Sequence, residues 1–361
     1  MLRFAIIGCG RVAGNHVAAI QAADGMELVA VCDLDRDKAN ALVIESPVPV
    51  YTNYREMLAT EQVDVTNIVT PSGMHCEHAI DVMSRFSCHV VVEKPMALRI
   101  EDCERMIATA QQEGVQLHVV LQNRFNKAIK RLRQDVDAGR FGRMTLGTVR
   151  LRWCRPQSYY DQAPWRGTWA MDGGALTNQA IHHIDLLQWL MGDIEVVSAT
   201  MSTQLVEVEV EDTAVAWLRF RNGAVGVIEA TTAARPGDFE ASVSLMGEGG
   251  TVIVEGTSAN QLVTYTFEDL DTGSFSETPP NVYGFGHSEF LTTVRDAIVA
   301  GKPPSVDGRE GMRPVQLLHA LYRSAEIGKA VRLDENAASA RLGVLTPETE
   351  RITQGYLLDE C

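Results

Sequence analysis

The first third of the chain alternates short apolar runs with amphipathic helical patterns. Runs such as Phe4–Ile7 and Val90–Val92 are apolar at successive positions instead of alternating with polar residues. Parallel strands have this pattern when helices cover both faces of their sheet. The runs are, in order, FAIIG, ELVAVCD, VDVTNIVT, HVVVEKP and VQLHVVL. The alternation predicts βαβ units and an α/β domain over residues 1–122, built on a doubly wound parallel sheet.

After Phe125 the pattern changes. Residues 127–139 predict a helix, and longer segments of alternating apolar and polar residues follow. Arg221-Asn222-Gly223 and Glu248-Gly249-Gly250 join pairs of these segments and are typical hairpin turns. The segments are residues 145–153, 196–204, 213–220, 224–231, 240–245 and 251–254. Consecutive hairpins predict an α+β domain with an antiparallel sheet, over residues 123–332.

Residues 288–300 and 314–329 predict amphipathic helices, and the pattern does not decide which domain they pack on. Residues 333–361 have little apolar periodicity and are predicted to form a peripheral tail.

Composition and charge narrow the function classes. A net charge of −15 opposes a phosphate backbone, so no nucleic-acid partner is expected. The seven cysteines contain no C-x-x-C pair and cannot all pair within one chain, which favours reduced thiols and a cytoplasmic location. No apolar run approaches 18 residues, and the N-terminus shows no signal-peptide pattern, so neither membrane insertion nor export is expected.

A glycine-rich turn follows the first predicted strand and opens a helix. Its sequence is Gly8-Cys9-Gly10-Arg11-Val12-Ala13-Gly14. This G-x-G-x-x-A pattern is typical of dinucleotide binding: Gly8 permits the tight turn, Gly10 lets the backbone approach the pyrophosphate, and the helix N-terminus attracts its charge. The pattern alone would also fit an ordinary strand-to-helix turn.

Asp33 ends the second predicted strand, about 20 residues beyond the glycines, where a carboxylate can accept both ribose hydroxyls. The same charge repels a 2′-phosphate, so NAD is favoured over NADP. Arg36 leaves NADP open, because its guanidinium could accommodate that phosphate.

Two later strand ends, Thr70-Pro71 and Glu93-Lys94-Pro95, are expected at the same edge of the sheet, where ligands of parallel sheets bind. An amine held there over a nicotinamide can hydrogen-bond a substrate hydroxyl, and the positive ring disfavours its protonated form. Lys94 is therefore a candidate catalytic residue, although a surface lysine following a strand is an equally good interpretation of position alone.

In the second domain, residues 175–190 predict an amphipathic helix after a Gly173-Gly174 pair. Asn178, His182 and Asp185 share one of its faces, which would carry either chemistry or a polar network. A zinc site is not expected, because the adjacent His182 and His183 point in different directions and no further ligands complete a set.

These motifs together resemble the glucose–fructose oxidoreductase/inositol dehydrogenase family, called Gfo/Idh/MocA. The resemblance rests on G-x-G-x-x-A, Thr70-Pro71 with His75, Glu93-Lys94-Pro95 and G-G-x-L-x-N-x-A-x-H-x-x-D-L, and it extends to about residue 332. It implies a Rossmann domain followed by a domain with a large, open-faced, mainly antiparallel sheet, and a homodimer or homotetramer formed through that sheet.

The resemblance also implies hydride transfer between NAD(P) and a secondary alcohol of a sugar, sugar acid, nucleotide-sugar or cyclitol. Lys94 would bind the reacting hydroxyl and His182 would be the general acid/base, a role that imidazole suits. Asn178 stands where many members have Asp, so it is expected to orient the substrate or Lys94. Residues expected to contact the cofactor are Gly8, Gly10, Arg11, Val12, Ala13, Asp33, Thr70, Pro71, His75, Glu93, Lys94, Trp165 and Arg166.

The stretch from Tyr159 to Trp169 resembles members that act at C3 of UDP-N-acetylglucosaminuronate. Arginines such as Arg152, Arg155 and Arg166 would suit an anionic substrate, since guanidinium pairs with carboxylate or phosphate. A solvated strand face is an equally good interpretation of Arg150, Arg152 and Arg155, and neutral sugars also stay open. The expected substrate residues are Arg124, Arg155, Tyr160, Asn178 and His182.

Two other functions remain open at this stage. The same fold could run in the reductive direction on a keto-sugar or another carbonyl. It could also serve as a non-catalytic dinucleotide sensor, although such a protein would need neither Lys94 nor His182.

Overall fold

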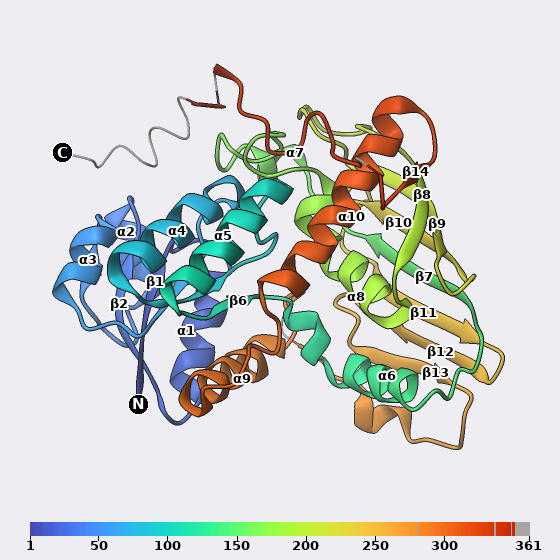
Figure 1. Cartoon of the computed structure of the whole chain (residues 1–361), viewed down its shortest axis with the longest axis horizontal. Helices are drawn as coiled ribbons and strands as arrows, with labels where there is room; N and C mark the ends of the chain where they lie inside the picture. The colour runs from blue at the N-terminus through green and yellow to red at the C-terminus, as the bar shows by residue number, and fades with distance from the viewer. Residues whose placement is uncertain (280, 336, 348, 351–361) are drawn as a thin grey trace. The chain divides into compact units, whose positions relative to one another are not determined.

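The computed structural model describes residues 1–279, 281–335, 337–347 and 349–350 (Figure 1). The chain forms two compact units. Unit 1 contains residues 1–120, 287–312 and the described part of 345–361, and unit 2 contains residues 121–286 and 313–344. Both units are therefore discontinuous in sequence. The prediction from the sequence placed residues 123–332 in the second domain and left open that its last helices pack back on the first domain.

Unit 1 is built on a six-stranded parallel sheet, which confirms the predicted α/β fold of the first third. The strand order is β3-β2-β1-β4-β5-β6. The strands are β1 (Leu2–Ile7), β2 (Met26–Cys32), β3 (Val50–Tyr51), β4 (Val65–Ile68), β5 (His89–Val92) and β6 (Leu117–Val119). The helices are α1 (Ala13–Ala22), α2 (Arg36–Leu42), α3 (Tyr54–Thr60), α4 (His75–Phe86) and α5 (Ile100–Glu113), with α9 (Gly286–Ala300) joining from His287 onward. The strands β4 and β5 are buried nearly throughout, as expected for a sheet covered on both faces.

Unit 2 contains an eight-stranded mixed sheet of order β13-β12-β11-β7-β10-β9-β8-β14. Its strands are β7 (Met144–Arg152), β8 (Ile194–Ser202), β9 (Thr213–Phe220), β10 (Val225–Thr231), β11 (Glu240–Gly247), β12 (Gly250–Glu255), β13 (Gln261–Tyr265) and β14 (Val331–Arg332). The two predicted hairpins are present as β9–β10 and β11–β12, and only the central β7–β10 pair is parallel. The mainly antiparallel sheet is thus confirmed.

One face of this sheet is covered and the other is open. The helix α8 (Ile181–Met191) packs against β7 and β11. Its close approach requires glycine at Gly147, where a Cβ would lie 2.8 Å from Met191 and 2.9 Å from Leu187. On the opposite face Val215 and Trp217 are 45% and 48% exposed, and strand β9 alternates buried and exposed residues along its length. This alternation is what one-sided burial produces.

Three further helical segments belong to unit 2, and a fourth is divided between the two units. They are α6 (Lys127–Asp137), α7 (Gln157–Tyr160), the π-helical turn η3 (Ala175–Gln179) and α10 (Gly308–Ile327), of which residues from Arg313 on belong to unit 2. The short 3-10 turns are η1 (Ser72–Met74), η2 (Gln122–Phe125) and η4 (Thr272–Phe275).

The segment predicted as a peripheral tail is partly built into unit 2. Leu342 is 1% exposed, Gly343 donates its backbone N–H to Trp169 O at 2.8 Å, and the Arg341 guanidinium stacks 4.3 Å from the Trp169 ring. Periodicity did not reveal this packing, because a single leucine and one stacked arginine leave no repeating pattern. Residues 336, 348 and 351–361 of the predicted tail lie outside the described residues.

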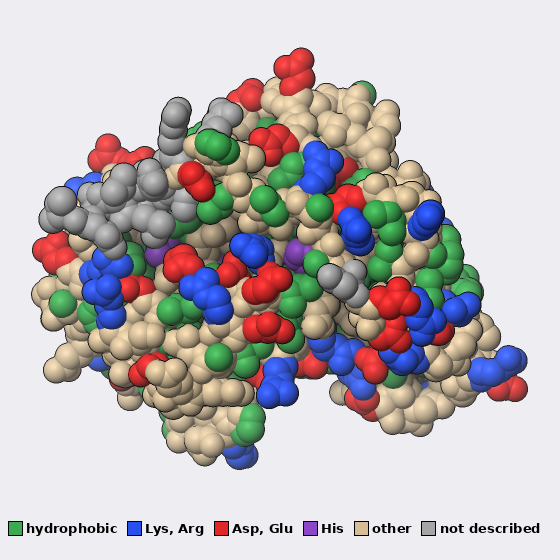
Figure 2. All heavy atoms as spheres, turned by 45° about the horizontal axis from the view of Figure 1, so that its top comes forward, with side chains coloured by type: hydrophobic (Ala, Val, Ile, Leu, Met, Phe, Trp, Pro, Cys, Tyr) green, Lys and Arg blue, Asp and Glu red, His purple; other side chains and the backbone are tan. Residues whose placement is uncertain are grey.

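On the face in Figure 2, basic and acidic side chains are interspersed and no extended basic patch forms. Among the described helices, none has the length and apolar character that a bilayer crossing requires.

Candidate functional site

The glycine-rich turn between β1 and α1 has the geometry that a dinucleotide site needs. Gly8 has a φ of +95°, and a Cβ there would lie 2.6 Å from Val69 O, so only glycine fits. Gly10 differs, because a Cβ there would meet no atom within 4 Å. Its glycine is therefore not required by packing, and the open space above it is where a pyrophosphate can approach backbone N–H groups.

Asp33 lies directly against this turn. One of its carboxylate oxygens accepts the Cys9 backbone N–H at 2.7 Å, and the other accepts that of Asp35 at 2.9 Å. The carboxylate is thereby held at the end of β2 with acceptor positions left for ribose hydroxyls. The donor set at the turn and this fixed carboxylate both fit an NAD molecule.

His75 links the two other strand ends that the sequence singled out. It is buried at the start of α4, with Nδ1 2.8 Å from Pro95 O and Nε2 2.9 Å from Thr70 O. Burial lowers the pKa of His75, although both carbonyls favour its charged form. This histidine therefore holds the Thr70-Pro71 and Glu93-Lys94-Pro95 segments together, which positions Lys94 at the edge of the sheet.

The predicted continuous α-helix over residues 175–190 is wrong in its first turn. Residues Ala175–Gln179 form the π-helical turn η3, and α8 begins only at Ile181. Asn178 lies in that turn, and its amide donates to the Asp172 carboxylate. Asp172 is 1% exposed and also accepts the Gly167 backbone N–H at 2.8 Å. The Asp172 carboxylate thus contacts Asn178, which is the position where the resemblance places Asp in many members.

Both glycines before η3 are explained by close packing. Gly173 has a φ of +75°, and a Cβ on Gly174 would lie 2.0 Å from a Glu211 carboxyl oxygen. The other oxygen of Glu211 accepts the Leu176 backbone N–H at 2.9 Å and the Tyr322 hydroxyl at 3.0 Å. Glu211 therefore anchors the turn that carries Asn178, from a position that is 3% exposed.

Glu211 gives unit 2 a pH-dependent stability. Burial raises its pKa from 4.5 to about 7, against the opposing effect of its hydrogen bonds. A carboxyl whose folded pKa is raised binds its proton more tightly in the folded state, so stability falls as the pH rises from about 4.5 through 7. The Glu211→Gln variant keeps the shape without the charge. We expect its thermal midpoint to fall less between pH 5 and pH 8, a difference worth up to about 3 kcal/mol.

The control for this prediction is Glu207→Gln, which changes an exposed carboxylate in the same region. Thermal unfolding of the three proteins at pH 5, 6, 7 and 8 measures the difference. Parallel curves for the wild-type protein and Glu211→Gln would show that Glu211 is ionised in the folded state.

His182 lies near the start of α8 and is 7% exposed. Its Nε2 is 3.2 Å from the side-chain Nε2 of Gln122, which can only donate. His182 Nε2 therefore accepts this hydrogen bond, and a ring nitrogen that accepts is the kind of atom that a general base uses. Gln122, in η2 after β6, was not singled out from the sequence.

Asp185, on the same helix, forms a buried two-point ion pair with Arg124. The Arg124 Nε and Nη2 atoms lie 2.8 and 2.6 Å from the two carboxylate oxygens, and both side chains are almost fully buried. Arg124 was predicted to bind substrate, but this pairing engages its guanidinium within the protein. Of the two interpretations of this helix face, chemistry or a polar network, the structure places Asp185 in a polar network.

Two other predicted substrate residues also have internal partners. Arg155 forms an ion pair with Asp238 at 2.9 Å, and the buried Tyr160 hydroxyl lies 3.3 Å from Thr232 Oγ1. Burial raises the pKa of Tyr160 to about 12, so the phenol stays neutral. Arg152, which was not among the predicted substrate residues, forms ion pairs with Glu229 and Glu240 on the open face of the sheet.

Arg166 differs from these arginines. Its guanidinium stacks between Tyr159 and Trp165, with 4.4 and 4.6 Å to the two ring centroids, and its Nη1 donates to the Tyr159 hydroxyl at 2.6 Å. Within the described part of the chain, no carboxylate lies within ion-pair distance of Arg166, and its buried Nε has no hydrogen-bond partner. Arg166 lines a hollow of unit 2 with Tyr160 and Thr168, and the acidic residues Asp161, Glu207 and Glu209 line the same hollow. Among the predicted anion-binding residues, Arg166 is the one that forms no ion pair within the described chain.

Two family models match the chain, one in each of its two parts. Residues 2–121 match the oxidoreductase family with an NAD-binding Rossmann fold, and residues 129–253 match the GFO/IDH/MocA C-terminal domain. The chain belongs to the Gfo/Idh/MocA oxidoreductase family. The predicted family is confirmed, and so is NAD as the cofactor class of this Gfo/Idh/MocA protein.

Individual relatives cover nearly the whole chain. The myo-inositol 2-dehydrogenase of Thermotoga maritima is 28% identical, with 92% of this chain and 99% of that protein covered. The D-glucoside 3-dehydrogenase of Escherichia coli is 27% identical, with 92% and 97% covered. Among solved structures, the WlbA dehydrogenase of Bordetella pertussis in complex with NADH and UDP-GlcNAcA is 40% identical, with a TM-score of 0.86 and 93% and 98% covered.

Proposed function

We propose that this protein is an NAD-dependent dehydrogenase that oxidises a secondary alcohol of a nucleotide-linked uronic acid, at C3 of a UDP-N-acetylglucosaminuronate-like substrate. The observation that carries the proposal is the 40% identity, over 93% of the chain, to a WlbA dehydrogenase whose complex contains NADH and UDP-GlcNAcA. The unpaired, stacked guanidinium of Arg166 supports it, because such a group is suited to a carboxylate or phosphate.

In this proposal NAD, held at the glycine-rich turn, would supply the hydride acceptor. Lys94 donates a hydrogen bond to the reacting hydroxyl, and His182 takes the hydroxyl proton at Nε2, in place of the hydrogen bond that this atom accepts from the Gln122 amide. Asn178, tied to Asp172, orients the substrate. Gly8, Gly10 and Asp33 would hold the pyrophosphate and the ribose. Reduction of a keto-sugar follows the same steps in reverse.

The Arg166→Met variant tests the substrate class. We expect its kcat/KM for UDP-N-acetylglucosaminuronate to fall about tenfold to a hundredfold, because a charge-assisted hydrogen bond is worth about 1.5–3 kcal/mol. Its kcat/KM for the neutral UDP-N-acetylglucosamine should change by less than about threefold. NADH formation at 340 nm measures both. The comparison variant is Arg155→Met, whose arginine already pairs with Asp238 and should discriminate less.

Equal losses of Arg166→Met on the acidic and the neutral substrate would remove the basis for a uronate. If the wild-type protein turned over neither nucleotide-sugar but oxidised free sugars or cyclitols, the broader family activity would stand and the nucleotide-linked substrate would not.

We also propose that the open sheet face of unit 2 pairs with a second copy of the chain. Val215, Trp217, Val225 and Val227 are exposed on the two adjacent strands β9 and β10. Exposed apolar residues grouped on one sheet face are typical of an interface. The solution mass by light scattering tests it, and a monomer at micromolar concentration would exclude it. The cytoplasmic location stays a prediction.

A further inference from the structure

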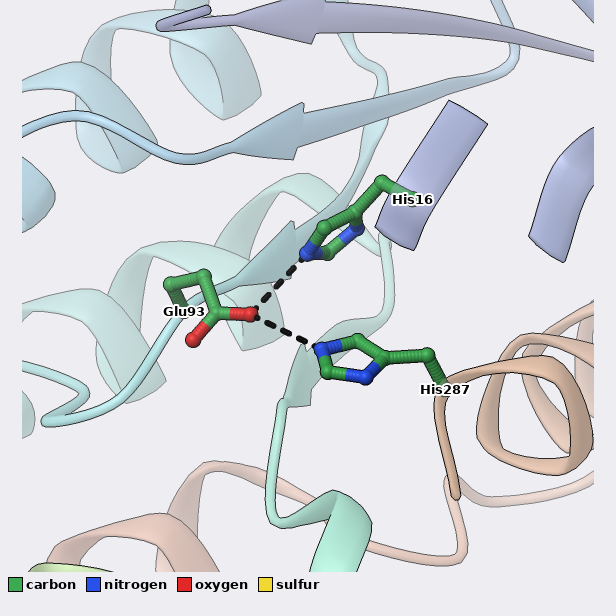
Figure 3. Close-up of side chains that lie close together, drawn as sticks. All are labelled: His16, Glu93 and His287. Carbon is green, nitrogen blue, oxygen red and sulfur yellow. Dashed lines mark hydrogen bonds and ion pairs between the residues drawn. The ribbon is translucent and has the colours of Figure 1, made fainter. Parts of the chain in front are cut away.

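A buried cluster in unit 1 includes the residue immediately before the proposed catalytic lysine. It consists of His16 from α1, Glu93 at the end of β5 and His287 at the start of α9 (Figure 3). All three are at most 5% exposed. Residues far apart in the sequence thus converge on one carboxylate, and that carboxylate belongs to the residue before Lys94.

The two oxygens of Glu93 have separate partners. His16 Nε2 lies 2.9 Å from Oε1, and His287 Nε2 lies 3.5 Å from the same oxygen. The second oxygen, Oε2, accepts the backbone N–H of Lys94 at 3.1 Å. The carboxylate therefore connects the two imidazoles on one side with the backbone that carries Lys94 on the other.

The cluster is better suited to hydrogen bonding than to holding a metal ion. The side-chain Nδ2 of Asn67 donates to His16 Nδ1 at 2.9 Å, so the proton of a neutral His16 lies on Nε2 and points at Glu93. In this tautomer His16 has no lone pair left for a metal. Neither ring nitrogen of His287 has a well-formed hydrogen bond within the described chain, and its Nε2 contacts Glu93 Oε1 at ion-pair distance, 3.5 Å.

The electrostatics of the cluster favour a charged Glu93. Burial alone would raise the pKa of Glu93, but the hydrogen bonds and charge of His16 and His287 outweigh it and hold the pKa well below its usual value. Burial lowers the pKa of His287, with Lys94 contributing in the same direction. The other titratable group that acts on this region is His75 on α4, whose own pKa burial also lowers.

We propose that His287, together with His16, is a positioning residue for the reaction: the two imidazoles hold Glu93 in place as a buried acceptor that fixes the backbone of Lys94. The proposal rests on the proposed role of Lys94. Residue 287 returns to unit 1 only after strands β7–β13 of unit 2, so the cluster that contacts the Lys94 backbone is completed by this returning segment.

Three variants test this proposal with the full-length protein. His287→Leu removes the donor, His287→Gln restores one at similar reach, and Glu93→Gln removes the charge. We expect His287→Leu to lower kcat about tenfold or more, because a small misplacement of a catalytic group is costly. The KM for NAD should change by less than about threefold. His287→Gln should recover most of the lost kcat.

The pH profile separates positioning from a general structural role. Without His287, burial should raise the pKa of Glu93 toward neutral pH. The acid limb of the pH profile of kcat in His287→Leu should therefore move to higher pH by about one unit or more. Glu93→Gln should have a low kcat without that added pH dependence. His118→Leu is the control, since it removes another buried imidazole of unit 1, bonded to Gln116 instead.

An unchanged kcat in His287→Leu, or a kcat lowered equally at every pH and not rescued by His287→Gln, would overturn the proposal. One equivalent of bound metal in the purified wild-type protein, lost in His287→Leu, would also overturn it, because the cluster would then be a ligand set. Failure of the proposed function is recognised separately, by the Lys94→Ala variant. In that case Lys94→Ala would stay active and the His287 variants would be unaffected.

Discussion

Lys94→Ala is expected to lower kcat about 10³-fold on any alcohol that the wild-type protein oxidises. The proposed amine donates a hydrogen bond to the oxygen on which negative charge develops, and loss of one such fixed donor costs about 10²–10³ in kcat. NAD affinity should change little, because the glycine-rich turn and Asp33 do not depend on this side chain. Steady-state kinetics, with NAD binding followed by fluorescence, measure both quantities.

Two controls accompany Lys94→Ala. Lys38→Ala removes an exposed lysine of α2 and should leave kcat within about twofold. Lys94→Arg keeps a positive charge but changes its shape and cannot lose its proton, so it should also be strongly impaired. A Lys94→Ala protein with more than a tenth of wild-type kcat would remove lysine from the mechanism. A wild-type protein that bound NAD but oxidised no polyol, uronate or nucleotide-sugar would favour a dinucleotide sensor.

His182→Gln is expected to lower kcat about 10²–10⁴-fold, the usual contribution of a positioned acid or base. Glutamine is of similar size and offers an oxygen to the Gln122 amide, so the local hydrogen bond can survive while proton transfer is lost. The limb of the pH profile that reports the protonation of the base should disappear. The profile of kcat/KM between pH 5 and pH 10 measures this change.

The neighbouring His183 supplies a matched control. It is 1% exposed, burial lowers its pKa to about 4, and neither of its ring nitrogens has a hydrogen-bond partner in the described chain. His183→Phe keeps an aromatic ring in this apolar site and should retain activity within about tenfold. A similar loss of activity in both variants would point to a structural effect on α8 and not to proton transfer by His182.

The glycine-rich turn was predictable because its requirements are local. Gly8 needs a positive φ, Gly10 needs open space, and Asp33 follows at the end of the next strand, all within about 30 residues. The helix bearing Asn178 was less predictable. Its apolar spacing matched an ordinary α-helix, but residues Ala175–Gln179 form a π-helical turn instead, directly after Gly174, which packs against Glu211.

The roles of the arginines could not be predicted, because an arginine's partner is usually distant in sequence. Arg124 finds Asp185 61 residues later, and Arg155 finds Asp238 83 residues later. Charge and spacing alone made them look like anion-binding residues. Arg166 kept that capacity because its neighbours in space are the aromatic rings of Tyr159 and Trp165.

The sequence by itself determined the two folds, the NAD-binding turn and the family, since these depend on short-range periodicity and on motifs with fixed spacing. Only the tertiary structure decided which polar residues meet. In the fold, the buried Glu211 accepts a hydrogen bond from the turn that carries Asn178. Arg124 forms a buried ion pair with Asp185, and His287 contacts Glu93, the residue before Lys94. The physical reason is that a buried charge must find its partner wherever the fold brings one, and the distance along the chain carries no information about it.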